Sequence, residues 1–434
     1  MNNKYTAFNK GNKAFSVDFE AQNISSEGGA VLIEQIELQH SIIKYFSSQI
    51  PDNRNKSYVK HSIEKLLKQR VFLMVQGYQD CNDAEKLKND PVIWETIGSA
   101  LASQPTLSRF ENMIDKYSLF ALLNTWLSNY IEGIDKDRKE LIIDIDGTDD
   151  PTHGHQQLSL FSGFYGQFMY NELFFHDGET GEIILPILRP GNSHSNRWYI
   201  AILKRIVKKI KEKRPDLKII IRADSGFSCP EIYKFAEEQG IEFAIGIAGN
   251  KVLQKNINWV ENLVKDIFEE STEKEQIFVG PFLYKAATWE KEQSCYAKVE
   301  YTGKGMNTRF FVSNFKQQKG REIYWNFYVK RGESSENRIK EIKNMCYSDR
   351  LSCHNFIANY FRLIISTIAY KFFIYIKQMI AKTKHEKAKK WNIDSIRLNL
   401  MKVGATIKKT VRRIIISFTK SYVYQELFSE LMLQ

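Results

Sequence analysis

The sequence has few cysteines. Its 434 residues include five cysteines that lie far apart, and none of them forms a Cys-x-x-Cys pair. Scattered thiols in odd number predict neither a disulfide framework nor a cysteine-ligated zinc site, and they fit a reducing compartment. The N-terminus lacks the apolar core of a secretory signal. We therefore expect a cytoplasmic location.

Long uncharged apolar runs are absent as well. The most apolar stretch, residues 356–380, is interrupted by Arg362, Lys371 and Lys377. We predict a buried helix there and no membrane contact. Internal repeats and low-complexity linkers are also lacking. Because 43% of the residues are hydrophobic and 13% are aromatic, the chain is expected to be globular, with two or three domains.

The positive charge is concentrated in one segment. Residues 371–420 contain 14 Lys or Arg and only two acidic residues, a balance of +12, whereas the whole chain carries +11. The rest of the chain is therefore close to neutral. A basic segment on a neutral body indicates a surface that meets a polyanion. A solvated helical face remains the alternative.

The N-terminal part has helical patterning. In the segment from Leu101 to Asn112, Ser103 and Pro105 are residues that begin helices. The helix would expose Ser108 and Arg109 in its first turns, as a helix-turn-helix does when it contacts DNA. An ordinary capped helix has the same composition, so the alternative stays open.

From about residue 138 the pattern changes to strands. Three strands, a helix, a strand, a helix and a further strand follow one another, an order that matches a ribonuclease-H-like mixed α/β sheet. Three more strands look like a β-meander inserted into this domain. We expect a helical N-terminal DNA-binding region (1–135), a ribonuclease-H-like domain in two parts (136–250 and 321–380), a β-rich insertion (251–320) and a basic C-terminal region (381–434).

The run from Glu140 to Thr148 carries two carboxylates at the end of an apolar strand. Period-two alternation places Asp144 and Asp146 on one face of this strand. A buried carboxylate is costly unless a charge lies against it, and no Lys or Arg is adjacent in this run. A bound cation is one explanation, and an acidic strand end that caps a loop is the other.

A second carboxylate, Asp224, directly follows a hydrophobic strand and precedes Ser225 and Gly226. If the two strands are neighbours, Asp146 and Asp224 face each other at one edge of the sheet. Two carboxylates alone would repel, so that one would become neutral. A divalent cation between them would remove that cost.

A third group lies on a predicted helix. Glu336, Lys340 and Lys343 are spaced i, i+4 and i+7 and therefore share one face. A carboxylate there could complete a metal site, and the lysines could hold phosphates. A Glu–Lys surface pairing, which is common on helices, is the alternative.

These motifs together resemble bacterial insertion-sequence transposases of the DDE class. The resemblance is to the group whose third acidic residue lies in a Tyr-x-x-Arg…Glu-x6-Lys signature, and it covers nearly the whole chain. The residues that carry it are Asp146-Gly-Thr148, Pro151-Thr-His-Gly154, Asp224-Ser-Gly-Phe227, Tyr328, Arg331, Glu336 and Lys343, with Leu101–Asn112 and Glu336–Glu341. The group usually has three residues between the Arg and the Glu, whereas this chain has four, which makes Glu333 a competitor of Glu336.

The resemblance implies a catalytic, metal-binding triad of Asp146, Asp224 and Glu336. Such a triad holds two Mg²⁺ ions, for which Mn²⁺ can substitute, and transfers phosphoryl groups in line. The resemblance also implies that Tyr328, Arg331, Lys340 and Lys343 bind phosphate or DNA. Asp144 is the runner-up for the first ligand, and His153 and His155 are further residues that could reach metal or phosphate.

The insertion of such enzymes sometimes stacks a displaced base on an aromatic ring. Trp289 is the first candidate here, with Tyr284, Tyr296 and Tyr301 as others, although aromatic residues in a small β-insertion commonly form its core.

The resemblance predicts a DNA transposase that cleaves and transfers the strands of an insertion sequence after binding its terminal inverted repeats. The partners would be double-stranded terminal and target DNA and a second subunit, with the protein at the nucleoid when bound to DNA. Two alternatives stay open, a DNA-binding protein of transposon origin that does not cut and a metal-dependent nuclease that does not rejoin strands.

Overall fold

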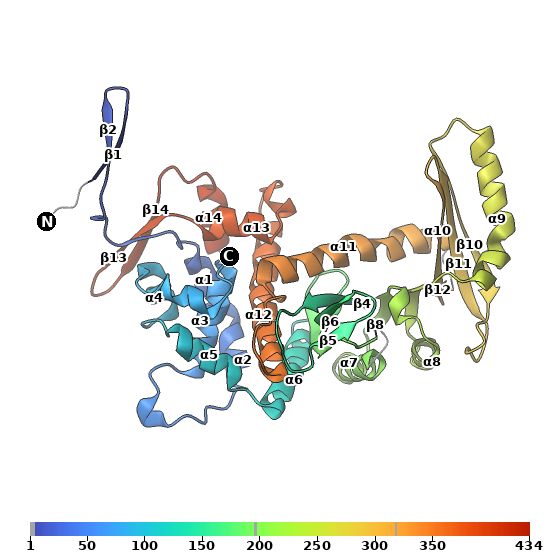
Figure 1. Ribbon diagram of the computed structural model, residues 1–434, viewed down its shortest axis with the longest axis horizontal. Helices are drawn as coiled ribbons and strands as arrows, with labels where there is room; N and C mark the ends of the chain where they lie inside the picture. Colours follow the sequence, from blue (N-terminus) through green and yellow to red (C-terminus); the bar gives the residue numbers. More distant parts are fainter. Residues whose placement is uncertain (1–4, 195–197, 317–318) are drawn as a thin grey trace. The chain divides into compact units, whose positions relative to one another are not determined.

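The chain forms two compact units in a computed structural model that describes residues 5–194, 198–316 and 319–434, without the side chains of residues 5–7 and 333–336. One unit comprises residues 1–48, 52–110 and 368–434. The other comprises residues 49–51 and 111–367. The first unit therefore joins both ends of the chain, and the second unit carries the central part (Figure 1).

The central unit is built on a mixed sheet of nine strands. The order β10-β11-β12-β9-β8-β4-β6-β5 runs across it, and β7 pairs with β6 beside β5. The sheet strands are β4 (Glu140–Pro151), β5 (Leu160–Ser162), β6 (Gln167–Asp177), β7 (Ile183–Pro190), β8 (Lys218–Ala223), β9 (Glu242–Ile247), β10 (Glu275–Tyr284), β11 (Gln293–Thr302) and β12 (Gly305–Ser313). The expected mixed α/β architecture with a large mixed sheet is therefore present.

Strand β4 lies in the middle of this sheet. It runs antiparallel to β6 and parallel to β8, and β8 runs parallel to β9. Ile143, Ile145 and Asp144 are all fully buried. Both faces of β4 are thus covered at this point, so that the Asp144 carboxylate lies in the interior of the unit.

The segment expected to be a β-rich insertion begins with a long helix, α9 (Lys251–Glu270), which the strand-based interpretation missed. Its apolar stripe of Leu253, Ile257, Val260 and Val264 is buried. The strands β10 to β12 form the expected meander. They do not stand apart, because β12 pairs with β9 and so continues the main sheet.

Helices connect and cover the strands of the central unit. Helix α6 begins where the Asp115 side chain accepts a hydrogen bond from the Ser118 amide, and its Trp126 indole donates to the Ile183 carbonyl of β7. The helical elements are α6 (Lys116–Glu132), α7 (Tyr199–Lys213), α8 (Pro230–Glu238), α9, α10 (Gly320–Glu322), the π-helix η4 (Ile323–Tyr328), α11 (Val329–Lys340) and the π-helix η5 (Glu341–Met345).

The other unit is mainly helical. Helix α3 begins after Ser62, whose side chain accepts a hydrogen bond from the Lys65 amide. Its strands form the hairpin of β1 (Tyr5–Lys10) and β2 (Lys13–Val17) and the sheet of β3 (Ile24–Ser25), β13 (Ala405–Lys409) and β14 (Ile414–Phe418). Its α-helices include α1 (Ala30–His40), α2 (Ile42–Ser47), α3 (Ile63–Val75), α4 (Pro91–Ile97), α5 (Gln104–Asn112), α13 (Ile393–Ile396) and α14 (Gln425–Met432). Helix α5 belongs to this unit as far as residue 110.

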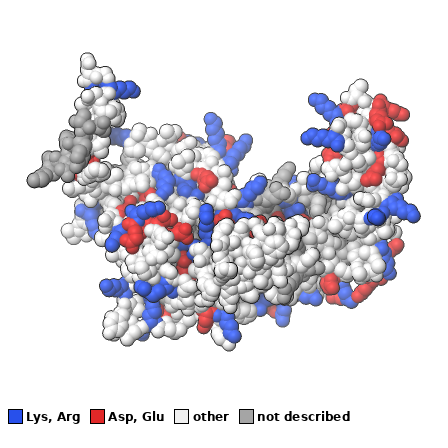
Figure 2. All heavy atoms as spheres, in the orientation of Figure 1, with Lys and Arg blue, Asp and Glu red and all other residues white. Residues whose placement is uncertain are grey.

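The apolar stretch forms the helix α12 (Phe356–Ala381), which passes from the central unit into the helical unit. It is long and apolar enough to cross a membrane, but 83% of its most apolar window is buried inside the protein. This burial is that of a core helix, as predicted. On the face drawn in Figure 2, Lys and Arg side chains occur in separate groups among Asp and Glu side chains.

Candidate active site at the ends of β4 and β8

Two carboxylates occupy matching positions on neighbouring parallel strands, Asp146 within β4 and Asp224 directly after β8. The predicted strand end at Asp146 was wrong, because β4 continues to Pro151. The register pairs Ile145 of β4 with Ala223 of β8, and the next residues are Asp146 and Asp224. One Asp146 oxygen accepts from the Gly147 amide at 3.0 Å, and one Asp224 oxygen accepts from the Gly226 amide at 2.8 Å. The expectation that the two strands are neighbours is therefore confirmed.

Asp146 lies in an environment that disfavours its charge. Its residue is 7% exposed. Burial and the nearby charge of Asp224 together raise its pKa to about 7, against the lowering effect of Arg331. Additional positive charge at this position would therefore be stabilising.

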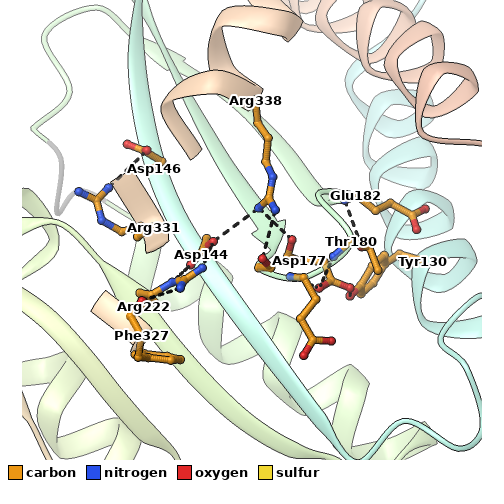
Figure 3. Close-up of polar contacts among 12 residues, drawn as sticks. Tyr130, Asp144, Asp146, Asp177, Thr180, Glu182, Arg222, Phe327, Arg331 and Arg338 are labelled. Atoms are coloured by element: carbon orange, nitrogen blue, oxygen red, sulfur yellow. Dashed lines mark hydrogen bonds and ion pairs between the residues drawn. The ribbon is translucent and has the colours of Figure 1, made fainter. Parts of the chain in front are cut away.

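Helix α11 and the π-helix before it bring two more predicted residues to this edge. The Arg331 Nη1 atom lies 3.5 Å from the Asp146 Oδ2 atom, and Figure 3 shows the guanidinium pointing at that carboxylate. The Tyr328 ring stacks on Phe311 with a centroid distance of 5.3 Å and an angle of 11°. Burial raises the pKa of Tyr328, which Arg331 lowers and Asp224 raises.

Gly246 on β9 makes room for the Tyr328 hydroxyl. A Cβ atom at this position would lie 2.5 Å from the hydroxyl oxygen and 2.8 Å from the Ser225 amide nitrogen. The phenol therefore lies against the turn that follows Asp224. Only a residue without a side chain allows this approach.

Asp144 does not share the surroundings of Asp146. The Arg222 guanidinium binds both of its oxygens, at 2.6 and 2.7 Å, and Arg338 lies 3.6 Å away (Figure 3). Arg222 also donates to the Phe327 carbonyl at 2.7 Å. The run 140–148 has no adjacent Lys or Arg, but Asp144 needs no bound cation, because Arg222 stands directly across from it in the parallel register.

The remaining predicted residues of the helix are only partly placed. Glu336 lies in α11, and its side chain is outside the described residues, as is that of its competitor Glu333. Lys340 is exposed at the end of α11. Lys343 donates to the Thr148 hydroxyl at 3.2 Å and to the Asp149 carbonyl at 2.6 Å, directly after the Asp146 position.

A buried acidic group lies beyond Lys343, and the sequence interpretation missed it. Asp150 and Glu172 are both fully buried. Burial and the neighbouring carboxylates, Asp349 among them, raise the pKa of each, while Lys343 lowers it. The available signal was the alternation of β4, which puts Asp150 on the same face as Asp146.

Four other predicted residues belong to α5 or to the loop after β4. Ser108 is half-buried and Arg109 exposed on α5, in the part that belongs to the helical unit. His153 and His155 are exposed in the loop that follows β4. Nothing in these positions assigns a ligand to them.

Trp289 is 8% exposed and meets Tyr233 and Tyr284 edge to face, at centroid distances of 5.1 and 5.3 Å. A base would need an open ring face to stack on. In this conformation the tryptophan packs within the protein.

The described side chains supply part of a candidate metal site. Among them, no group of three or more His, Cys, Asp or Glu side chains is arranged to hold a metal ion. Asp146 and Asp224 supply hard oxygen donors of the kind that Mg²⁺ prefers. A third donor would have to come from a side chain outside this set, as Glu336 is.

Comparisons with known proteins give one extended match. Residues 8–434 match the family model described as transposase DDE domain group 1. Among solved structures, a piggyBac transposase in a cryo-EM synaptic complex with hairpin DNA is similar, with 12% identity, coverage of 86% of this chain and 79% of that chain, and a TM-score of 0.45. No curated protein matches the chain.

Proposed function

Because the chain belongs to the DDE transposase family, we propose that it cleaves DNA at the ends of an insertion sequence and transfers the freed strands to target DNA. The observation that carries the proposal is the pair of carboxylates, Asp146 on β4 and Asp224 directly after β8, with Arg331 held against Asp146. Asp146, Asp224 and Glu336 are the catalytic residues of this proposal.

The strand arrangement supports a ribonuclease-H-like interpretation of the sheet. The antiparallel strands β4, β6 and β7 are followed by β8 and β9, which run parallel to β4. The helices α7 and α8 make the two crossovers. This arrangement puts the first and second carboxylates of the proposed triad side by side.

The proposed cofactor is a pair of Mg²⁺ ions, with Mn²⁺ as a substitute. Asp146 and Asp224 fit this role, because burial and the charge of Asp224 disfavour the charge of Asp146, and both residues offer oxygen donors. Glu336 would be the third ligand. When bound, such ions activate the attacking oxygen and stabilise the leaving one.

The chain's own residues would position and neutralise the phosphate. Arg331, beside Asp146, lies where negative charge develops during phosphoryl transfer. Tyr328 lies against the turn after Asp224, where a hydroxyl can orient a phosphate oxygen. Lys343 holds the strand that follows Asp146, and Lys340 is free to turn toward the DNA backbone at the exposed end of α11.

The proposed partners are the terminal inverted repeats, target DNA and a second copy of the chain. The basic segment supports contact with DNA, since its hairpin of β13 and β14 exposes Lys408, Arg412 and Arg413. Ser108 and Arg109 on α5 are proposed to contribute to end binding. The protein would act in the cytoplasm, at the nucleoid.

A cleavage and joining assay tests the proposal. The substrate is a duplex with the inverted repeat that borders the reading frame, incubated with Mg²⁺ and then with target DNA. We expect nicking at the repeat end and joining of the 3′ end by the wild type, and loss of both in Asp224→Asn. Asp216→Asn, an exposed acid before β8, is the matched control and should keep both activities.

The outcomes separate the alternatives. A wild type that binds the repeat but never nicks it would be a DNA-binding protein of transposon origin. A wild type that nicks but never joins would be a nuclease. Full cleavage by Asp224→Asn would show that the assignment of Asp224 as a catalytic residue is wrong.

A further inference from the structure

A cavity of about 510 Å³ opens beside the proposed active site. One of its walls is the turn between β5 and β6, which contributes Phe161, Phe164 and Tyr165. Phe164 is 89% exposed, Phe161 is 53% exposed and Tyr165 is 41% exposed. Three neighbouring aromatic rings thus face a hollow and lie uncovered by the protein.

The deeper side of the cavity is polar. It includes Asn171 of β6 and Arg189 of β7. Arg189 is 1% exposed, and its Nε atom donates to the Asn171 side-chain oxygen at 3.1 Å. Burial lowers the pKa of Arg189 to about 10. A buried guanidinium and an amide therefore supply fixed hydrogen-bonding groups beneath the rings.

The cavity adjoins the carboxylates themselves. Asp224 and Gly147 both line it. A Cβ atom at Gly147 would lie 3.8 Å from the Arg189 Nη2 atom. Tyr165 is close enough to Asp146 and Asp224 for their charges to raise its pKa, in addition to the effect of burial. A phosphate held at these carboxylates would put the next nucleotide at the mouth of the cavity.

The walls fit a flat, aromatic ligand with polar edges. Nucleobases stack on exposed aromatic rings whatever their sequence, and guanidinium and amide groups bond to base edges. The cavity volume lies in the range of about 300–1,000 Å³ that is common for sites of small ligands. A base inside a duplex cannot enter such a cavity, so an occupant must be unpaired.

We propose that the cavity of Phe161, Phe164, Tyr165, Asn171 and Arg189 binds one unpaired nucleobase of the DNA next to the scissile phosphate. This inference rests on the proposed function. The site differs from the position of Trp289, which packs between Tyr233 and Tyr284.

A double-mutant cycle between a ring and a base tests the inference. The variants are Phe164→Ala and, as control, Tyr117→Ala, an aromatic on α6 of the same unit that is 73% exposed and lies outside the cavity lining. The full-length protein is given duplexes with the bordering inverted repeat, either intact or with a single abasic nucleotide at each position beside the scissile phosphate. The first nick is timed in Mg²⁺.

On intact DNA we expect Phe164→Ala to nick about tenfold more slowly than the wild type, the size of one lost stacking contact. At one abasic position the wild type and Phe164→Ala should nick at equal rates, because the base that the ring would bind is missing. Tyr117→Ala should match the wild type on every substrate.

Three results would overturn the inference. One is an effect of Phe164→Ala that is the same on every abasic substrate, which would indicate a backbone contact. Another is an equal loss in Tyr117→Ala, which would indicate a general effect of removing an exposed aromatic ring. The third is normal nicking by Phe164→Ala. In each of these cases the wild type still nicks the DNA, so the proposed function is not contradicted. A wild type that nicks no substrate would contradict the proposed function itself.

Discussion

At the scale of residues, two carboxylates on one strand face have opposite surroundings. Asp144 is fully buried in a bidentate pair with Arg222. Asp146, two residues on, lies at the sheet edge against Arg331 and has a raised pKa. The pair of Asp144 with Arg222 stabilises the fold, whereas the charge of Asp146 would be stabilised by a bound ligand.

Substitution of the two should therefore separate stability from activity. Asp144→Asn leaves Arg222 as an uncompensated buried charge, and we expect a loss of about 3–5 kcal/mol in the free energy of unfolding. Asp146→Asn removes a charge that burial disfavours, so its stability should equal or exceed that of the wild type while DNA nicking is lost. Urea unfolding and the nicking assay measure the two effects, and a folded, stable Asp144→Asn would contradict this account.

The buried acids Asp150 and Glu172 should make stability depend on pH. Their pKa values are raised in the folded protein, so the unfolded chain loses these protons at lower pH than the folded chain does. The stability that these two acids contribute is fully present below pH 4, and it falls as the pH rises toward their raised pKa values.

Asp150→Asn should remove part of this dependence. The free energy of unfolding of the variant minus that of the wild type should increase by about 1 kcal/mol or more between pH 5 and pH 8. Urea titrations at the two pH values measure the gain. Parallel pH profiles of variant and wild type would show that the Asp150 carboxyl is not held neutral.

At the scale of elements, the placement of α11 depends on the strand β9. Gly246→Ala would put a Cβ atom against the Tyr328 hydroxyl and the Ser225 amide, so the Tyr328 side chain or the turn after Asp224 must move. We expect nicking to fall at least tenfold, with a stability loss of about 1–3 kcal/mol. The control is Gly249→Ala, whose Cβ would meet only the Phe310 ring at 3.6 Å. Equal nicking by both variants would show that the contact with Tyr328 does not matter.

The elements also show what a sequence can predict. The alternation of β4 and the apolar strand before Asp224 were enough to place both carboxylates on neighbouring strands, because they depend on local patterns. Helix α9 was missed although its buried stripe of Leu253, Ile257, Val260 and Val264 has helical spacing. The residues that follow this helix have a strand pattern, and the whole segment was therefore predicted to be β-rich.

Contacts between distant parts of the chain could not be predicted in this way. Arg222 partners Asp144 across 78 residues, and the partnership depends on the register of two strands. Glu172 joins Asp150 only because β6 folds back beside β4. The side chain of Glu336 is not described, so the third residue of the triad remains a prediction.

At the scale of the whole molecule, the positive charge has a defined location. The tip of the hairpin of β13 and β14 exposes Arg412, Arg413 and the fully exposed Val411. Both arginines belong to the helical unit, whereas the carboxylates belong to the central unit. DNA affinity and catalysis should therefore respond to different substitutions.

Arg412→Ala with Arg413→Ala should weaken DNA binding and reduce the slope of log affinity against log salt by about 2. Nicking of saturating DNA should change little, since the carboxylates are untouched. Lys208→Ala with Lys213→Ala on α7 has the same charge change and should leave the salt slope closer to that of the wild type. Fluorescence anisotropy over a range of salt concentrations measures the slope. Equal slopes for the two double variants would show that Arg412 and Arg413 do not contact the DNA.

The most direct test of the central claim measures Mg²⁺-dependent nicking of the bordering inverted repeat by Asp146→Asn, Asp224→Asn and Glu336→Gln, with Glu333→Gln as the matched control on the same helix. The account predicts that each of the three loses at least about a thousandfold in rate while binding the repeat as the wild type does, and that Glu333→Gln keeps its rate. Wild-type nicking by any of the three, or loss only in Glu333→Gln, would contradict it.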